Sequence, residues 1–120
     1  MEYESAVTIE SARAGVTIQV RRMSFGRRLE LMKRVRELAR RVEFLEAGSA
    51  AGNRMDAGLA RAEIDCAFVL WGVAGISGLR IDGAEATVEA LVEHGPEDVF
   101  REALAAARRE AGLTAEERKN

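Results

Sequence analysis

The sequence predicts a single α+β domain over residues 1–120 that is predominantly helical. Its expected parts are an N-terminal β-hairpin, a long helical hairpin on which it packs, and shorter C-terminal helices. β-branched residues alternate over residues 6–23, and apolar residues recur every three or four positions over residues 24–78. Shorter helical patterns fill residues 84–119. The hydrophobic content of 48% suits one domain with one core.

The N-terminal hairpin is predicted from two short stretches with strand character, AVTIE and VTIQV. Ala14 and Gly15 lie at the natural turn between them. In the second stretch, Val16, Ile18 and Val20 share one face of the strand. Because a two-stranded hairpin alone is marginally stable in water, we expect this face to pack on the helices.

The first long helix is expected to begin after Ser24, whose side chain makes a good N-cap, and to end near Gly48. Its apolar residues step by four and three, the spacing of a seam in a helical bundle or a coiled coil. That seam consists of Leu31, Val35, Leu38, Val42 and Leu45.

The second long helix is expected to begin between residues 53 and 56 and to lie at the middle of the packing. It holds the only Cys and the only Trp of the chain within an uncharged run over residues 66–76. This run is too short to cross a membrane, which takes about 20 apolar residues. The expected inward seam is Met55, Leu59, Ala62, Cys66, Val69, Val73 and Ile76.

The C-terminal part is predicted to hold one short extended piece and two short helices. Residues 79–83 enter an Asp-Gly turn, with the N-terminal hairpin as a candidate pairing partner. Helices follow over residues 84–93 and from Pro96 to Gly112, and a capping-box pattern at residues 114–117 opens a final charged turn. Their expected buried residues are Val88, Leu91, Val92, Val99, Phe100, Ala103, Leu104 and Ala107.

Few residues offer catalytic or metal-binding chemistry. His94 is the only histidine, and beside a Gly-Pro helix break we interpret it as a solvent-facing residue. Cys66 occupies an apolar helical position, which favours a core thiol over a reactive one. Carboxylate pairs such as Glu97 and Asp98 are explained by helix N-termini. The sequence therefore predicts no enzyme, no cofactor and no metal site.

The compartment is expected to be the cytoplasm. The first ten residues, MEYESAVTIE, lack the basic and apolar regions of a secretory signal. A single Cys cannot form an internal disulfide, which fits a reducing environment.

Charge is unevenly distributed although the net charge is only −2. Residues 21–41 carry nine basic side chains against Glu30 and Glu37, a local charge of +7. Residues 82–102 carry seven acidic side chains against Arg101, a local charge of −6. Blocks of opposite sign attract over about 10 Å at moderate salt, either within the fold or between copies of it.

The basic helix admits two interpretations. Arginines along one helical side can neutralise phosphates, and a helix fits a major groove, so nucleic acid binding through residues 21–41 is one alternative. The slightly acidic chain and the acidic residues that interrupt this run favour a solvated or protein-contacting face instead. The candidate partner-binding residues on this helix are Met32, Lys33, Arg36, Arg40 and Arg41.

Four segments occur in a defined order along the chain: RRMSFGRRLEL, IDG-x-x-AT-x-E-x-L, GPED-x-x-REAL and GL-x-x-EERKN. With the apolar helix around Trp71 between the first two, this order resembles small tail assembly chaperones of tailed bacteriophages and prophages. The resemblance covers the chain from about Val16 to Asn120, and none of its motifs has an invariant chemical role.

The resemblance implies a non-enzymatic protein that binds the tape-measure protein and helps tail-tube protein assemble around it in the bacterial host cytoplasm. Such a protein has no active-site residues and is absent from the finished particle. One alternative is a structural tail or head–tail component of the virion, and the other is a small nucleic-acid-binding protein using residues 21–41. The seam over residues 31–45 can face its own core or a second subunit, so a homo-oligomer is also considered.

Overall fold

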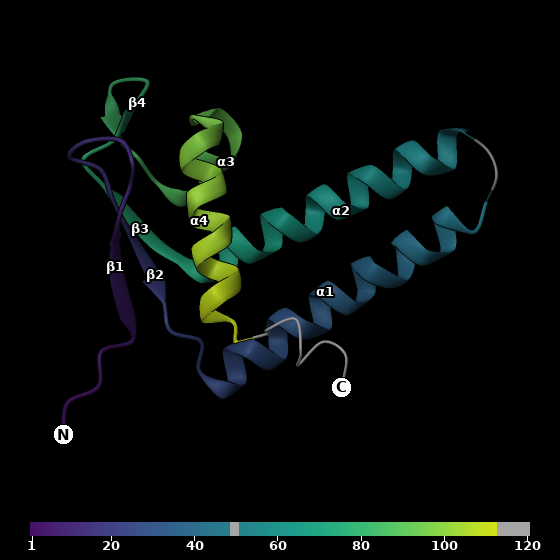
Figure 1. The fold of residues 1–120 in the computed structure, drawn as a ribbon, viewed down its shortest axis with the longest axis horizontal. Helices are drawn as coiled ribbons and strands as arrows, with labels where there is room; N and C mark the ends of the chain where they lie inside the picture. Colours follow the sequence, from purple (N-terminus) through teal and green to yellow (C-terminus); the bar gives the residue numbers. More distant parts are fainter. Residues whose placement is uncertain (49–50, 113–120) are drawn as a thin grey trace.

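The computed structural model of the chain describes residues 1–48 and 51–112 (Figure 1). The predicted α+β class, with an N-terminal sheet, a long helical hairpin and shorter C-terminal helices, is confirmed. The predicted capping box at residues 114–117 lies outside the described residues. The elements in chain order are β1 (Ala6–Glu10), β2 (Thr17–Arg21), α1 (Phe25–Glu46), α2 (Ala51–Gly72), β3 (Val73–Ser77), β4 (Arg80–Ile81), β5 (Ala84–Glu85), α3 (Val88–His94) and α4 (Glu97–Glu110).

The N-terminal sheet is antiparallel with the strand order β1-β2-β3. The register of the predicted hairpin places Ile9 opposite Ile18 and Val7 opposite Val20. Val16, Ile18 and Val20 are all buried, with the last two fully inaccessible to solvent. The prediction that this face of the strand packs on the helices is confirmed.

The third strand corrects the predicted extent of the second helix. α2 ends at Gly72, and Val73–Ser77 form β3 instead of continuing the helix through Ile76. Val73 and Ile76 keep the helical spacing, so periodicity alone did not mark this boundary. β3 pairs with the free edge of β2, where Ile76 lies opposite Ile18, and so satisfies backbone groups that a two-stranded hairpin would leave unpaired.

The segment after β3 forms its own small hairpin, and the predicted pairing with the N-terminal strands is wrong. β4 pairs with β5, with Ile81 opposite Ala84. The two turn residues between them, Asp82 and Gly83, both have positive φ, of 51° and 82°. A two-residue loop with this backbone matches the twist of the flanking strands, which explains the local pairing.

The two C-terminal helices largely match the prediction. α3 begins at Val88, because residues 84–85 are in β5 and the Thr87 side chain caps the helix by accepting a hydrogen bond from the Ala90 N–H at 3.1 Å. α4 is followed by Gly112, whose φ of 76° suits a glycine at a helix end. The predicted apolar residues are buried or half-buried: Val88, Leu91, Val92, Val99, Phe100, Ala103, Leu104 and Ala107.

The start of α1 is held by a local cap and by a long-range contact. Ser24 is the N-cap and accepts a hydrogen bond from the Arg27 N–H at 3.2 Å, as predicted. The Arg27 guanidinium donates to the Trp71 carbonyl at 2.8 Å and lies 5.0 Å from the centre of its ring. This contact ties the beginning of α1 to the end of α2. The predicted α1 seam is buried or half-buried throughout: Leu31, Val35, Leu38, Val42 and Leu45.

The predicted inward seam of α2 is wrong over its first half. Met55 is 73% exposed and Leu59 is 62% exposed. The face that packs with Val42 of α1 consists instead of Ala57, Ala60 and the half-buried Ile64. Small side chains allow the two helices to approach closely, so the larger residues face away from α1.

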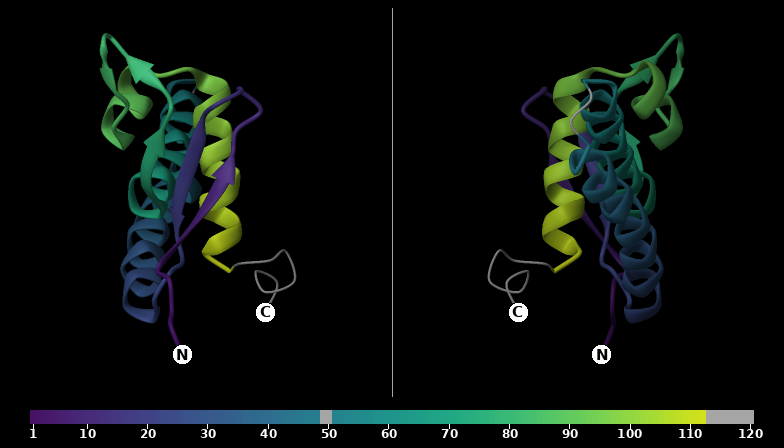
Figure 2. Two further views of the ribbon diagram at one scale, coloured as in Figure 1. Left: turned by 90° about the vertical axis from the view of Figure 1, so that its left-hand side faces the viewer. Right: turned by 90° about the vertical axis from the view of Figure 1, so that its right-hand side faces the viewer.

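The sheet, α3, α4 and the adjoining ends of α1 and α2 enclose the main core. The opposite end of the helical hairpin extends beyond this body (Figure 1). Viewed from the sheet, the hairpin runs away behind it while α4 lies alongside (Figure 2). The molecule is therefore flat, with principal extents of 46 × 40 × 20 Å.

Candidate functional site

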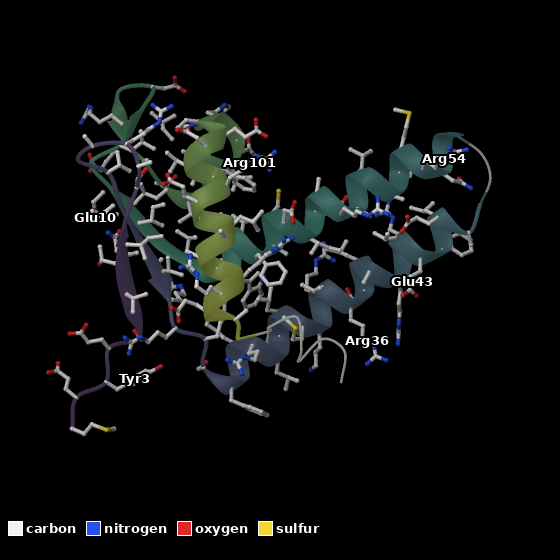
Figure 3. The ribbon with its side chains drawn as sticks, in the orientation of Figure 1. Tyr3, Glu10, Arg36, Glu43, Arg54 and Arg101 are labelled. Atoms are coloured by element: carbon white, nitrogen blue, oxygen red, sulfur yellow. The ribbon has the colours of Figure 1, made fainter. Side chains whose placement is uncertain are left out.

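Three of the predicted partner-binding residues lie together on the side of α1 that points away from α2. Lys33, Arg36 and Arg40 are exposed and follow the i, i+3, i+7 spacing of one helical face. Figure 3 shows Arg36 directed away from α2. We call these three residues the α1 cation row. Its only ion pair among the described residues joins Lys33 Nζ to Glu30 Oε1 at 3.8 Å.

The other two predicted residues lie outside this row. Met32 is half-buried and packs against the main core, so its side chain serves the fold. Arg41 is exposed but lies one turn from Glu37, on the side of α1 where Glu37 and Arg34 form an ion pair of 3.6 Å. The structure therefore brings together three of the five predicted side chains.

No ion pair joins the two charge blocks within the described part of the chain. Asp98 of the acidic block pairs with Arg13 at 2.8 Å, and Glu102 accepts hydrogen bonds from the Ser11 hydroxyl at 2.6 Å and the Ala12 N–H at 2.8 Å. All three of these partners lie in the loop that joins β1 to β2. The acidic residues therefore hold α4 to this loop, and the α1 cation row remains available to solvent.

An apolar stripe on α2 also faces solvent. It consists of Met55, Leu59, Ala62 and Cys66, which step by four, three and four and therefore share one helical face. The first three are exposed and Cys66 is half-exposed. We call these four residues the α2 stripe. Large apolar side chains aligned on a helix surface are typical of a site that binds another apolar surface.

The α2 stripe leads into a groove of about 350 Å³ where α2, α3 and α4 meet. Half-buried Phe100 and Val92 give the groove apolar walls, and the exposed Arg101 of α4, labelled in Figure 3, also lines it. The residues that line it are Ala62, Asp65 and Cys66 of α2, Leu91 and Val92 of α3, Gly95, and Glu97, Phe100, Arg101 and Leu104 of α4.

The charges in the groove are paired. Asp65 forms an ion pair with Arg108, whose guanidinium lies 5.4 Å from the centre of the Phe68 ring. Glu97 accepts from the Arg101 guanidinium at 2.8 Å. With these charges compensated, the groove offers contact area to a partner and has no converging set of free ionisable groups.

Cys66 lies at the junction of the α2 stripe and the groove. It is half-exposed, so the predicted core thiol is in fact at the surface of the fold. Partial burial raises the pKa of this thiol, and the negative charges of Asp65 and Glu63 raise it further. At neutral pH the thiol is therefore protonated and behaves as a small apolar group.

The predicted solvent-facing position of His94 is confirmed, because it is exposed at the last residue of α3. Within residues 1–48 and 51–112, no three or more His, Cys, Asp or Glu side chains gather as metal ligands. No helix in the part of the chain that the structure describes combines the length and apolarity needed to cross a bilayer.

Sequence reasoning missed the α2 stripe as a surface because its four-and-three spacing is also that of a buried seam. A signal was present in the parallel row of Ala57, Ala60 and Ala67, which gives α2 a second apolar face of small residues. Two apolar faces on one helix indicate two packing partners, and this fold supplies one of them in α1.

Comparison of the chain with protein-family models, with curated proteins and with solved structures finds no match.

Proposed function

We propose that this protein is a non-enzymatic tail assembly chaperone that binds a helical segment of the tape-measure protein and assists tail-tube assembly. The observation that carries the proposal is the exposure of Met55 and Leu59 in line with the apolar groove. Burial of apolar surface gains roughly 25 cal/mol per Å², so a partner that covers this stripe gains binding energy. The sequence resemblance supplies the identity of that partner.

The α2 stripe suits an amphipathic helix. From Met55 to Cys66 it spans about 16 Å of helix, which is three turns. A partner helix with apolar residues at matching spacings can place them between those of the stripe. Met55 is unbranched and adapts to different neighbouring side chains, a property suited to a surface that meets several segments of one long protein.

Covering such segments would keep the tape-measure protein soluble until tail-tube protein surrounds it. The apolar stripes of a long helical protein associate with each other when they are exposed, and a chaperone that covers them prevents this. No bond is made or broken in this role, so it requires no catalytic residue. The proposed place of action is the cytoplasm of the bacterial host.

Co-expression with the tape-measure protein of the same prophage tests the proposal. The expected result is a soluble tape-measure protein that co-purifies with this chain, and loss of the complex with the double variant Met55→Glu/Leu59→Glu. Glutamate is a good helix former, so these changes leave α2 intact. Phe44→Glu is the matched control, because Phe44 is 80% exposed on the other helix of the hairpin. An insoluble, unbound tape-measure protein beside the unmodified chain would overturn the proposal.

The α1 cation row supports a second candidate function, nucleic acid binding. Lys33, Arg36 and Arg40 span about 10 Å of one helical face and can contact successive phosphates. A DNA mobility shift that weakens with salt and is lost in Lys33→Gln/Arg36→Gln/Arg40→Gln would favour this candidate. Detection of the protein in purified virions by mass spectrometry would favour a structural tail or head–tail component.

A further inference from the structure

The carboxylates beside the α2 stripe point to the chemistry of the segment that it binds. We infer that this segment is a heptad-patterned helix with lysine or arginine along the edge of its apolar face, paired with Asp56 and Glu63. The inference rests on the proposed function, since it specifies the partner of the same surface. It adds a second requirement, because apolar spacing alone would not select among helical segments.

Asp56 and Glu63 occupy equivalent positions along the stripe. They are seven residues apart, so they lie two turns from each other on the same side of α2, separated by about 10 Å. Each directly follows a stripe residue, Met55 or Ala62, as the position e of a heptad follows d. Positions next to an apolar seam determine partner choice and orientation in coiled coils.

Asp56 and Glu63 have no ion-pair partner among the described residues. The carboxylates that line the groove, Asp65 and Glu97, are both paired. On the opposite edge, Asp65 is paired with Arg108. Arg34 of α1 lines the same hollow as Glu63 but pairs with Glu37 at 3.6 Å. Asp56 and Glu63 are therefore free to bind cations of a partner helix.

A second copy of this chain is a poor occupant of the stripe. Antiparallel pairing of two α2 helices through the stripe would place Asp56 and Glu63 against the same residues of the other copy, where like charges repel. Parallel pairing would place Glu63 against Gly58 of the other copy and Asp56 against its residue 51, an alanine, and neither offers a cation. The outward face of α1 has cations, but Lys33, Arg36 and Arg40 occupy the middle of it, so it cannot cover an apolar stripe.

Two synthetic helical peptides test the inference. They share the same leucine positions over three heptads, and their edge positions carry either lysine throughout or glutamate throughout. Like charges along both edges also keep each peptide from pairing with itself. Fluorescence anisotropy with the full chain should show that the lysine peptide binds about three- to tenfold more tightly at low salt. This preference should disappear near 1 M salt because exposed charges are then screened.

Variants of the edge make the test specific. Asp56→Lys/Glu63→Lys should reverse the preference, and Asp56→Asn/Glu63→Gln should abolish it while apolar binding remains. Glu43→Gln/Glu89→Gln is the matched control, since it removes two exposed carboxylates away from the stripe and should leave the preference intact. Equal binding of both peptides by the unmodified chain, or a preference for glutamate, would refute the inference.

The two proposals can fail separately. If the tape-measure complex is lost in Leu59→Glu but survives Asp56→Lys/Glu63→Lys unchanged, the stripe is the binding site and the inferred edge chemistry is wrong. If the complex also survives Leu59→Glu, the stripe is not the site. Concentration-dependent dimers that Leu59→Glu abolishes, with no peptide bound at any salt concentration, would identify a second copy as the occupant and overturn the inference.

Discussion

Gly72, the last residue of α2, lies directly against Ala107 of α4. A β-carbon on Gly72 would be 2.7 Å from the Ala107 Cβ and 3.4 Å from its Cα. Both residues are buried. This contact brings α4 close to α2, and α4 forms one wall of the groove at the end of the α2 stripe.

Gly72→Ala is expected to destabilise the protein by about 1–3 kcal/mol, because the added methyl group overpacks this contact. The free energy of unfolding from urea titration measures the effect. Gly58→Ala is the control, since a β-carbon there has no neighbour within 4 Å and alanine favours the helix by up to about 1 kcal/mol. Equal stability of both variants would show that α2 and α4 are not in close contact.

Gly78→Ala is expected to destabilise the protein more than Gly83→Ala. Both glycines have positive φ, of 81° and 82°, so alanine at either position carries a backbone cost of about 1–2 kcal/mol. At Gly78 the new β-carbon would also clash with the carbonyl oxygen of Gly15, whereas at Gly83 it would meet nothing within 4 Å. Thermal unfolding of the two variants should therefore give a clearly lower midpoint for Gly78→Ala, and a reversed order would contradict the packing of these loops.

The Arg13–Asp98 pair is expected to make stability depend on pH in the acid range. Hydrogen bonds from the Arg13 guanidinium, at 2.8 and 3.2 Å, lower the pKa of Asp98 in the folded state. The pair therefore stabilises the fold above about pH 4, the ordinary pKa of aspartate, and this contribution is lost as the pH falls through the lowered value.

Urea titrations between pH 6 and pH 2 measure this contribution through the unfolding midpoint. Asp98→Asn should flatten the fall in midpoint with decreasing pH, and Arg13→Gln should have the same effect. The double variant should add nothing further, because either change removes the same pair. An unchanged pH dependence in Asp98→Asn would show that the pair does not form in solution.

Cys66 is expected to react with iodoacetamide only at higher pH than a free thiol such as N-acetylcysteine. Partial burial and the charges of Asp65 and Glu63 raise its pKa, and the thiolate is the reactive form. Alkylation rates measured from pH 7 to pH 11 test this. Glu63→Gln should move the profile toward lower pH, since it removes one of the two negative charges, whereas Glu89→Gln on α3 should not.

The distal end of the α1–α2 hairpin is expected to exchange its amide hydrogens faster than α4. Among the residues that the structure describes there, its core consists of Val42, Ala57 and Ala60, with Leu45 and Ile64 beside them. A segment with so few buried apolar contacts opens locally at a lower free-energy cost than the main core. Hydrogen–deuterium exchange followed by mass spectrometry should show this difference, and bound partner helix should reduce it. Equal protection of the two regions would contradict the expectation.

Most side chains of α1 lie on the side that the sequence predicts, because each has one dominant environment. Leu38 and Val42 lie on its apolar side and are buried, while Lys33, Arg36 and Arg40 lie opposite and are exposed. Charged side chains remain in water unless they are paired, so a helix with one charged side has only one orientation in the fold. Met32 is not part of the exposed α1 cation row, because it lies at the edge of the apolar side of the helix and its side chain packs against the core.

The pattern of the sequence determined which residues form apolar faces: Ile18 and Val20 on a strand, Leu31 and Leu38 on one helix, and Met55 and Leu59 on another. Tertiary structure alone decided what covers each face. Residues 73–77 form a third strand because they pair with the free edge of β2. The alanine face of α2 packs against α1 because small side chains allow the two helices to approach closely. Periodicity is a local property of the chain, whereas the choice between two apolar faces depends on the shape of the element that packs against them.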